Sequence, residues 1–160
     1  MTVPGDTLAR VMDRDHELMG LALERASACV EWGDVPIGAV VARGSEVLAA
    51  FGNERERRSD PTAHAEVLAL REAASRLGTW RLDGCTMVVT LEPCAMCAGA
   101  LVLARVDRLV FGALDPKAGF AGSLGNLVED PRLNHRLAVA GGVRAGESAE
   151  LIRTFFASRR

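Results

Sequence analysis

Long apolar runs are missing from this sequence of 160 residues. A helix that crosses a bilayer needs about 18 or more consecutive apolar residues, and no stretch of the chain reaches that length. The first twenty residues carry several acidic side chains and lack the central apolar region of a secretory signal. We therefore expect a cytoplasmic protein without a membrane partner.

Lysine is nearly absent, because Lys117 is the single lysine among 19 basic residues, and we draw no function from this bias. The other proportions are ordinary: 49% hydrophobic and 25% charged residues exclude collagen-like, coiled-coil and fully disordered chains. At this length a chain buries enough surface for one core without disulfides. The net charge of -2 slightly disfavours a polyanionic partner.

Helical and extended patterns alternate along the chain, and this alternation indicates one α/β layered domain over residues 13–160. Residues 1–12 are expected to be disordered. Apolar spacings of three and four predict helices, and short apolar runs bounded by turn residues predict strands. The expected helices cover residues 13–31, 60–78, 94–104 and 147–158, and the expected strands cover 35–42, 46–51, 85–91, 108–113 and 137–144. Loops are expected over 52–60 and 115–126.

Cys94 and Cys97 form a Cys-x-x-Cys pair on the first turn of a predicted helix. The free N–H groups and the positive dipole end of a helix N-terminus favour thiolates there. His64 lies in the first turn of another predicted helix, and two helix N-termini above one sheet edge can converge. Two thiolates and one imidazole nitrogen suit Zn²⁺, and three protein ligands leave its fourth position for water. We therefore predict a zinc site formed by His64, Cys94 and Cys97.

Glu66 gives this zinc site its expected catalytic purpose. It lies two residues after His64, so on a regular helix its side chain points in a different direction and reaches the fourth zinc position from the side. There it would take a proton from the zinc-activated water, whose pKa falls towards about 7, and return it to a leaving group. The pattern predicts attack by hydroxide on an electron-poor ring carbon.

Three other interpretations of these residues remain open. The Cys-x-x-Cys pair could be a redox pair, the zinc could be purely structural, or His64 and the two cysteines could be buried core residues. A structural site would normally have a fourth protein ligand, and neither Cys29 nor Cys85 has ligand-like spacing. His-x-Glu together with Pro-Cys-x-x-Cys is more specific than any of its parts.

This combination of motifs resembles the bacterial tRNA-specific adenosine deaminases of the cytidine/deoxycytidylate deaminase superfamily. The resemblance runs from about Glu17 to the end of the chain. It rests on VPIGAV (35–40), Asn53, DPTAHAE (60–66), TLEPCAMCAGA (90–100), residues 110–123, NHR (134–136) and Phe155-Phe156. It implies the cytidine-deaminase-like fold, a three-layer α/β structure whose central mixed five-stranded sheet is flanked by helices.

The same resemblance implies an activity and an assembly. The family converts adenosine to inosine at the wobble position, A34, of a tRNA anticodon stem-loop, and it acts as a homodimer without a further protein partner. One zinc ion per subunit would be held by His64, Cys94 and Cys97, with Glu66 as the proton shuttle. Glu66 would pass the proton of the zinc-activated water to N1 of adenine as hydroxide adds to C6. Loss of ammonia then leaves inosine.

Three further residues match substrate-binding positions of the family. Asn53 corresponds to a contact with the flipped target nucleotide, although a loop asparagine could also simply form an Asx turn. Asp115 matches a residue near the preceding nucleotide, where a carboxylate could accept from a ribose 2′-OH; a solvated loop residue is the other interpretation. Phe156 is expected to contact a base, while Phe155 is expected in the core.

Two other functions share parts of this pattern. A small-molecule deaminase that acts on guanine or a cytosine compound would use the same zinc site and glutamate. The matches at Asn53, Asp115, Lys117 and Gly122-Ser123 favour tRNA. A non-catalytic, zinc-stabilised RNA-binding subunit is the third possibility, and the presence of Glu66 weakens it.

Overall fold

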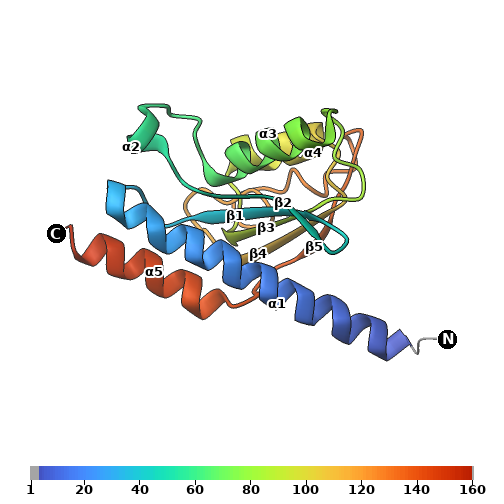
Figure 1. The fold of residues 1–160 in the computed structure, drawn as a ribbon, viewed down its shortest axis with the longest axis horizontal. Coiled ribbons are helices and arrows are strands. Elements are labelled where there is room, and N and C mark those ends of the chain that lie inside the picture. Colours follow the sequence, from blue (N-terminus) through green and yellow to red (C-terminus); the bar gives the residue numbers. More distant parts are fainter. Residues whose placement is uncertain (1–3, 160) are drawn as a thin grey trace.

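A five-stranded mixed sheet forms the centre of the protein, in the order β2-β1-β3-β4-β5 (Figure 1). The computed structural model describes residues 4–159. Strand β1 pairs antiparallel with β2 and with β3, whereas β3, β4 and β5 run parallel. The strands are β1 (Gly38–Arg43), β2 (Glu46–Gly52), β3 (Thr86–Leu91), β4 (Arg108–Ala113) and β5 (Ala138–Ala140). The mixed five-stranded sheet implied by the resemblance is confirmed.

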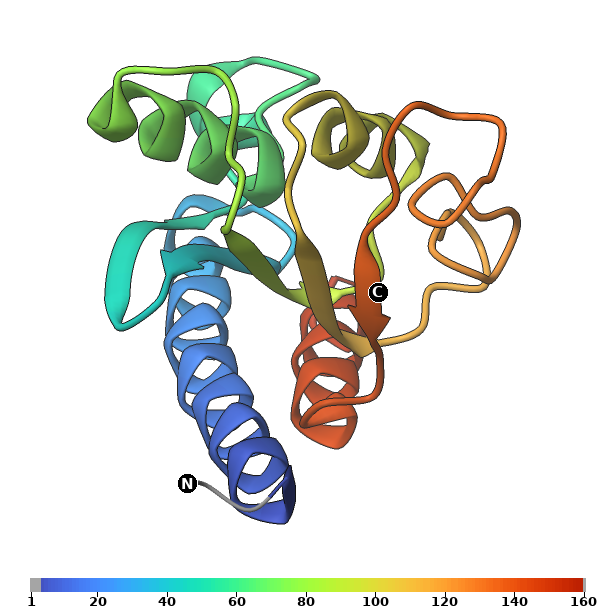
Figure 2. The same ribbon diagram turned by 90° about the vertical axis from the view of Figure 1, so that its right-hand side faces the viewer.

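Helices cover both faces of this sheet, so the protein has three layers. Figure 2 shows α3 (Ala65–Leu77) and α4 (Ala95–Leu103) on one face, with α1 (Pro4–Ala28) and α5 (Ala145–Ala157) on the other. One core cluster lies between the sheet and α3 and α4, and a second lies between the sheet and the opposite helices. The predicted three-layer α/β fold is confirmed.

Alternate residues of each central strand pack into these two clusters. In β1, Ala39 and Val41 belong to the cluster beneath α3 and α4, while Val40 and Ala42 belong to the cluster beneath α1. Successive side chains of a strand point to opposite faces of the sheet. Both faces are covered by helices, and this is why the strand is apolar throughout instead of alternating with polar residues.

Helix α1 begins at Pro4, whereas the sequence analysis expected disorder over residues 1–12 and a helix from Asp13. That expectation is corrected for residues 4–12, and residues 1–3 lie outside the described range. Leu8 and Met12 are exposed. Once the packed part of the helix has formed, however, each further residue that joins it gains one backbone hydrogen bond, and the helix can therefore extend beyond the core. Within residues 4–159, no helix has both the length and the apolar character that a bilayer crossing demands.

A short helix, α2 (Arg55–Arg58), lies within the predicted loop over residues 52–60. The buried carboxylate of Asp34 accepts hydrogen bonds from the backbone N–H groups of Glu56 at 3.0 Å and of Arg57 at 3.3 Å. It therefore satisfies donors at the start of the helix that have no partner within it. Because this carboxylate comes from 22 residues earlier, the local sequence does not reveal the helix.

Among the other element boundaries, the start of α3 and the end of β5 differ most from the prediction. Helix α3 begins at Ala65 with His64 as its N-cap, later than the predicted residue 60. The Asp60 carboxylate accepts from the backbone N and the hydroxyl of Thr62, both at 2.8 Å, and this Asx turn keeps the segment out of the helix. Strand β5 spans three residues instead of the predicted 137–144, because the chain turns away at Gly142, whose φ is 83°.

Two contacts determine how α1 lies on the sheet. A Cβ atom at Gly38 would lie 1.9 Å from the carbonyl oxygen of Ala22, so only glycine permits this approach of β1 to α1. The buried carboxylate of Asp15 accepts two hydrogen bonds from the guanidinium of Arg108, at 2.7 and 2.6 Å. This bidentate pair joins α1 to the first residue of β4.

Candidate metal site and substrate cavity

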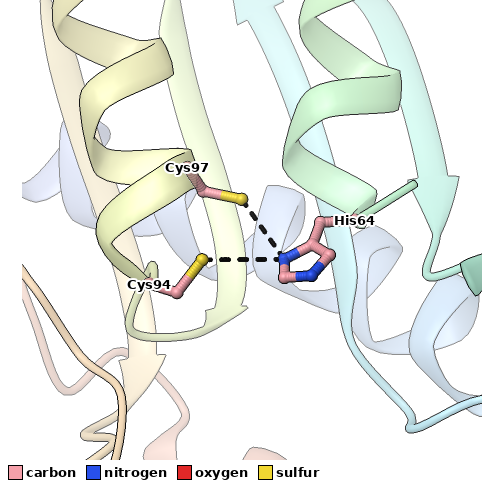
Figure 3. Close-up of side chains that lie close together, drawn as sticks. All are labelled: His64, Cys94 and Cys97. Atoms are coloured by element: carbon pink, nitrogen blue, oxygen red, sulfur yellow. Dashed lines mark hydrogen bonds between the residues drawn. The ribbon is translucent and has the colours of Figure 1, made fainter. Parts of the chain in front are cut away.

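Three side chains converge at the start of α3 and α4. His64 is the N-cap of α3, Cys94 is the N-cap of α4, and Cys97 lies in the first turn of α4. His64 Nδ1 lies 3.7 Å from Cys94 Sγ and 3.5 Å from Cys97 Sγ. Figure 3 shows the three side chains pointing toward one another across the gap between the two helices. The convergence of two helix N-termini that the sequence predicted is therefore present.

The chemistry of these three groups suits a zinc ion. Their ligand atoms all lie within 4.8 Å of one another, and no other His, Cys, Asp or Glu of the described residues joins the group. Two sulfur atoms and one imidazole nitrogen form a ligand set that zinc binds tetrahedrally, and a catalytic site keeps one position for water or substrate. His64, Cys94 and Cys97 can therefore hold a metal ion with an open fourth position.

The contacts among these three side chains favour one thiolate. A hydrogen bond from the Cys97 thiol, together with one from His64, lowers the pKa of Cys94 to about 4. The same contact with Cys94, reinforced by burial, raises the pKa of Cys97. The hydrogen bond to Cys94 also raises the pKa of His64, against the effect of burial. A metal ion would displace the protons that these groups share.

Glu66 lies in the first turn of α3, one residue after Ala65, which follows the His64 cap. Only 4% of its surface is exposed, and burial raises the pKa of its carboxyl group. A buried carboxyl group with a raised pKa can carry a proton near neutral pH, as a general acid and base must. Its position beside the metal ligands is what the predicted role requires.

A cavity of about 450 Å³ opens at this site. Six of the seven predicted site residues line it, namely Asn53, His64, Glu66, Cys94, Asp115 and Phe156. The seventh, Cys97, is buried behind them on α4. The wall also includes two basic residues, Arg55 and Lys117. The structure thus brings together residues from five separate segments of the chain, as the sequence analysis expected.

Asn53 and Asp115 both line the cavity, and the side chain of each also forms a local hydrogen bond to the backbone of its own loop. The Asn53 side chain donates to the Val35 carbonyl oxygen at 3.3 Å and accepts from the Arg55 backbone N at 3.3 Å. The Asp115 carboxylate accepts from the backbone N–H groups of Lys117 and Ala118 at 3.1 and 3.2 Å. Their contacts with a nucleotide stay predictions.

The two phenylalanines near the end of α5 have different surroundings. Phe155 is 6% exposed and belongs to the core, whereas Phe156 is 49% exposed and lines the cavity. Their rings meet edge to face with centroids 5.3 Å apart. The expected burial of Phe155 is confirmed, and Phe156 is placed where a base could stack on it.

One buried acidic residue of the cavity wall, Glu92, was not predicted from the sequence. Glu92 is 2% exposed and lies between the end of β3 and the ligand Cys94. Its carboxylate accepts hydrogen bonds from the loop that contains Asp115. An acidic residue directly before Pro-Cys-x-x-Cys, at the end of an apolar strand, is the signal that could have drawn attention to it.

The comparisons with known proteins agree with this site. Residues 12–160 match the family described as MafB19-like deaminase. The chain is 47% identical to the tRNA-specific adenosine deaminase of Bacillus subtilis over 93% of this chain and 92% of that protein. A solved structure from a study of A-to-I editing by tRNA:A34 deaminases at the wobble position is 43% identical, with a TM-score of 0.81, and covers 84% of this chain and 98% of that one.

A related enzyme with a different substrate is also similar in structure. The guanine deaminase of Nitrosomonas europaea is 27% identical, with a TM-score of 0.77, over 89% of this chain and 84% of that chain. Both likenesses place the chain among the deaminases, and the higher identity lies with the tRNA enzymes. The chain belongs to the family of the bacterial tRNA-specific adenosine deaminases.

Proposed function

We propose that this chain catalyses the hydrolytic deamination of adenosine to inosine at the wobble position, A34, of a tRNA anticodon. The observation that carries the proposal is a cavity whose wall contains both the metal-ligand group and the buried carboxyl group of Glu66. The names of the relatives supply the substrate. The overall reaction consumes one water and releases one ammonia for each adenosine.

Zinc held by His64, Cys94 and Cys97 would supply a nucleophile at neutral pH by lowering the pKa of water. Glu66 moves the protons. It takes a proton from the attacking water and gives it to N1 of adenine as the C6–O bond forms. It then takes the proton of the new C6 hydroxyl group and gives it to the amino group, which leaves as ammonia when the C6–N bond breaks. Burial raises the pKa of Glu66, and this helps the carboxyl group to hold each proton between its acceptance and its delivery.

The size of the cavity is consistent with binding of a single base that has been extruded from its stack. About 450 Å³ lies within the range of small-molecule sites and suits one nucleoside. A base must therefore be extruded to reach Glu66, and unstacking costs least in a single-stranded loop. Arg55 and Lys117 in the wall place positive charge where the flanking phosphates would approach.

The direct test is to incubate the zinc-loaded protein with a tRNA that has an ACG anticodon and to sequence the RNA before and after. We expect A-to-G changes at the wobble position, because inosine is read as guanosine. Release of ammonia is measured in the same reactions. Intact adenosine at that position after long incubation would contradict the proposal.

Glu66→Gln is expected to lower kcat by at least about 100-fold and to leave the zinc content unchanged. The amide keeps the size of the side chain but cannot transfer protons. The matched control is Glu72→Gln, which changes an exposed glutamate on the same helix. Near-normal turnover by Glu66→Gln would remove Glu66 from the mechanism.

A deaminase acting on free guanine is the second candidate, and the likeness to the Nitrosomonas guanine deaminase is the observation that favours it. Guanine, cytosine and cytidine are therefore assayed beside the tRNA. Deamination of a free base with intact tRNA would select this alternative. Zinc and tRNA binding without any ammonia would instead indicate a non-catalytic subunit.

We further propose that the protein is a cytoplasmic homodimer with one zinc ion per subunit. Helix α4 leaves two apolar side chains open, since Met96 is 38% and Leu103 is 70% exposed, and this supports a partner on that face. Sedimentation equilibrium gives the mass of the assembly, and elemental analysis gives the zinc content. A monomer at micromolar concentration would contradict the dimer.

A further inference from the structure

Glu92 holds the loop between β4 and residue 123 by four hydrogen bonds. Its Oε1 accepts from the backbone N of Asp115 at 2.9 Å and from the hydroxyl of Ser123. Its Oε2 accepts from the backbone N–H groups of Ala121 at 3.1 Å and of Ser123 at 3.0 Å. Both carboxylate oxygens are therefore used, and the bonds hold the loop at Asp115, Ala121 and Ser123.

The loop closes tightly around this carboxylate. A Cβ atom at Gly119 would lie 2.3 Å from the carboxyl carbon of Glu92, so a side chain there would displace it. The backbone N of Phe120 donates to the Pro93 carbonyl oxygen at 2.8 Å, and Gly119 forms a β-bridge with Cys94. The segment 92–94 therefore carries a metal ligand and anchors the loop at the same time.

The part of the loop held in this way is a wall of the cavity. Residues 114–118 all line it, and the Glu92 carboxylate holds the amide of Asp115 within this stretch and the amide of Ala121 just after it. Four donors around one buried carboxylate require an acceptor with two oxygens. A glutamine at position 92 would offer one acceptor oxygen, and its NH₂ group would face loop N–H or O–H groups that are themselves donors. Part of the loop would therefore lose its hydrogen bonds to residue 92.

We infer that Glu92 is a positioning residue that sets the distance between the wall formed by residues 114–118 and the metal ligands, and so determines how tightly the substrate is bound. This inference rests on the proposed function for its substrate, an anticodon stem-loop. Glu92 does not transfer a proton in this role. The expected signature is therefore a higher KM with kcat little changed.

The test compares Glu92→Gln and Ser123→Ala with wild type on an anticodon stem-loop. We expect Glu92→Gln to raise KM about tenfold and Ser123→Ala about threefold, with kcat within about threefold of wild type and normal zinc content. Glu129→Gln is the control, because this glutamate is exposed and follows the loop. Its side chain accepts a hydrogen bond from the side chain of Asn126 and none from the residues 114–118 that line the cavity. Its KM should equal that of wild type.

Two results would overturn the inference. One is a wild-type KM in Glu92→Gln or, if that variant does not fold, in Ser123→Ala. The other is a loss of kcat or of zinc at unchanged KM, because it would place Glu92 in the chemistry or in metal binding. If wild type deaminates guanine and not the stem-loop, the proposed function fails, and the same comparison of KM and kcat with guanine still decides the role of Glu92.

Discussion

The four cysteines differ in how burial and neighbouring groups shift the pKa of the thiol. The contacts with Cys97 and His64 lower the pKa of Cys94 to about 4 and so favour its thiolate form at neutral pH. Burial raises the pKa of Cys29 to about 11, and burial also raises that of Cys85. Because the thiolate is the reactive form, these differences predict which cysteine an alkylating reagent reaches.

In the zinc-stripped protein, iodoacetamide at about pH 6 is expected to modify Cys94 first, because only this thiol is ionised at that pH. Cys29 and Cys85 stay unmodified, since both are buried and protonated. Peptide mass spectrometry measures the extent at each site. Reloading with zinc should protect Cys94, and equal labelling of Cys29 would contradict the assignment.

The sequence was sufficient to predict the group that could bind a metal ion, but not every residue around it. His64, Cys94 and Cys97 are recognisable because a short motif and a known ligand chemistry define them. Glu92 and Asp34 are different, since each carboxylate accepts from backbone amides 22 or more residues later in the chain. A single acidic letter does not show where such amides lie, and only the folded chain brings them together.

At the scale of elements, the strands were predicted best. Both faces of the sheet are covered, so β1, β3 and β4 appear in the sequence as short apolar runs. Helix starts were predicted less well because distant or very local contacts decide them: Asp34 caps α2, and the Asp60 turn delays α3. The propensity of a segment does not contain this information.

Gly38→Ala is expected to destabilise the fold by about 3 kcal/mol, because the new methyl group would overlap the backbone of α1 at Ala22. The helix must then move away from β1 and lose contacts with the core. Urea denaturation followed by circular dichroism measures the loss.

Gly146→Ala is the control for this variant. Gly146 lies in α5, and a Cβ atom added there would meet no atom within 4 Å beyond its own turn of the helix, so alanine should be neutral or slightly stabilising. Equal stability of the Gly38 variant and wild type would contradict the requirement for glycine at the close approach of β1 to α1.

At the scale of the whole molecule, we expect the fold to be independent of the metal site. Two apolar clusters on opposite faces of the sheet contain most of the buried side chains, and His64 and Cys94 lie at the edge as helix caps. A chain of this length buries enough apolar surface to fold without a metal. The metal site is therefore expected to be unnecessary for folding.

Removal of zinc with 1,10-phenanthroline should therefore abolish ammonia release and leave the far-ultraviolet circular dichroism spectrum unchanged. The Tm is expected to fall, because a ligand that binds only the folded state stabilises it. Activity should return when zinc is added back. A chelated protein with the spectrum of an unfolded chain would contradict this independence of the fold.

Helix α1 connects two distant regions of the molecule. Its last residues lead through η1 (Cys29–Trp32) to the wall residue Val35, while its 25 residues carry the other end about 37 Å away (Figure 1). A reporter or affinity module attached ahead of α1 would stand clear of an approaching anticodon arm. The N-terminal end of α1 is therefore a suitable point at which to immobilise this enzyme on a surface, because it lies far from the opening through which substrate enters.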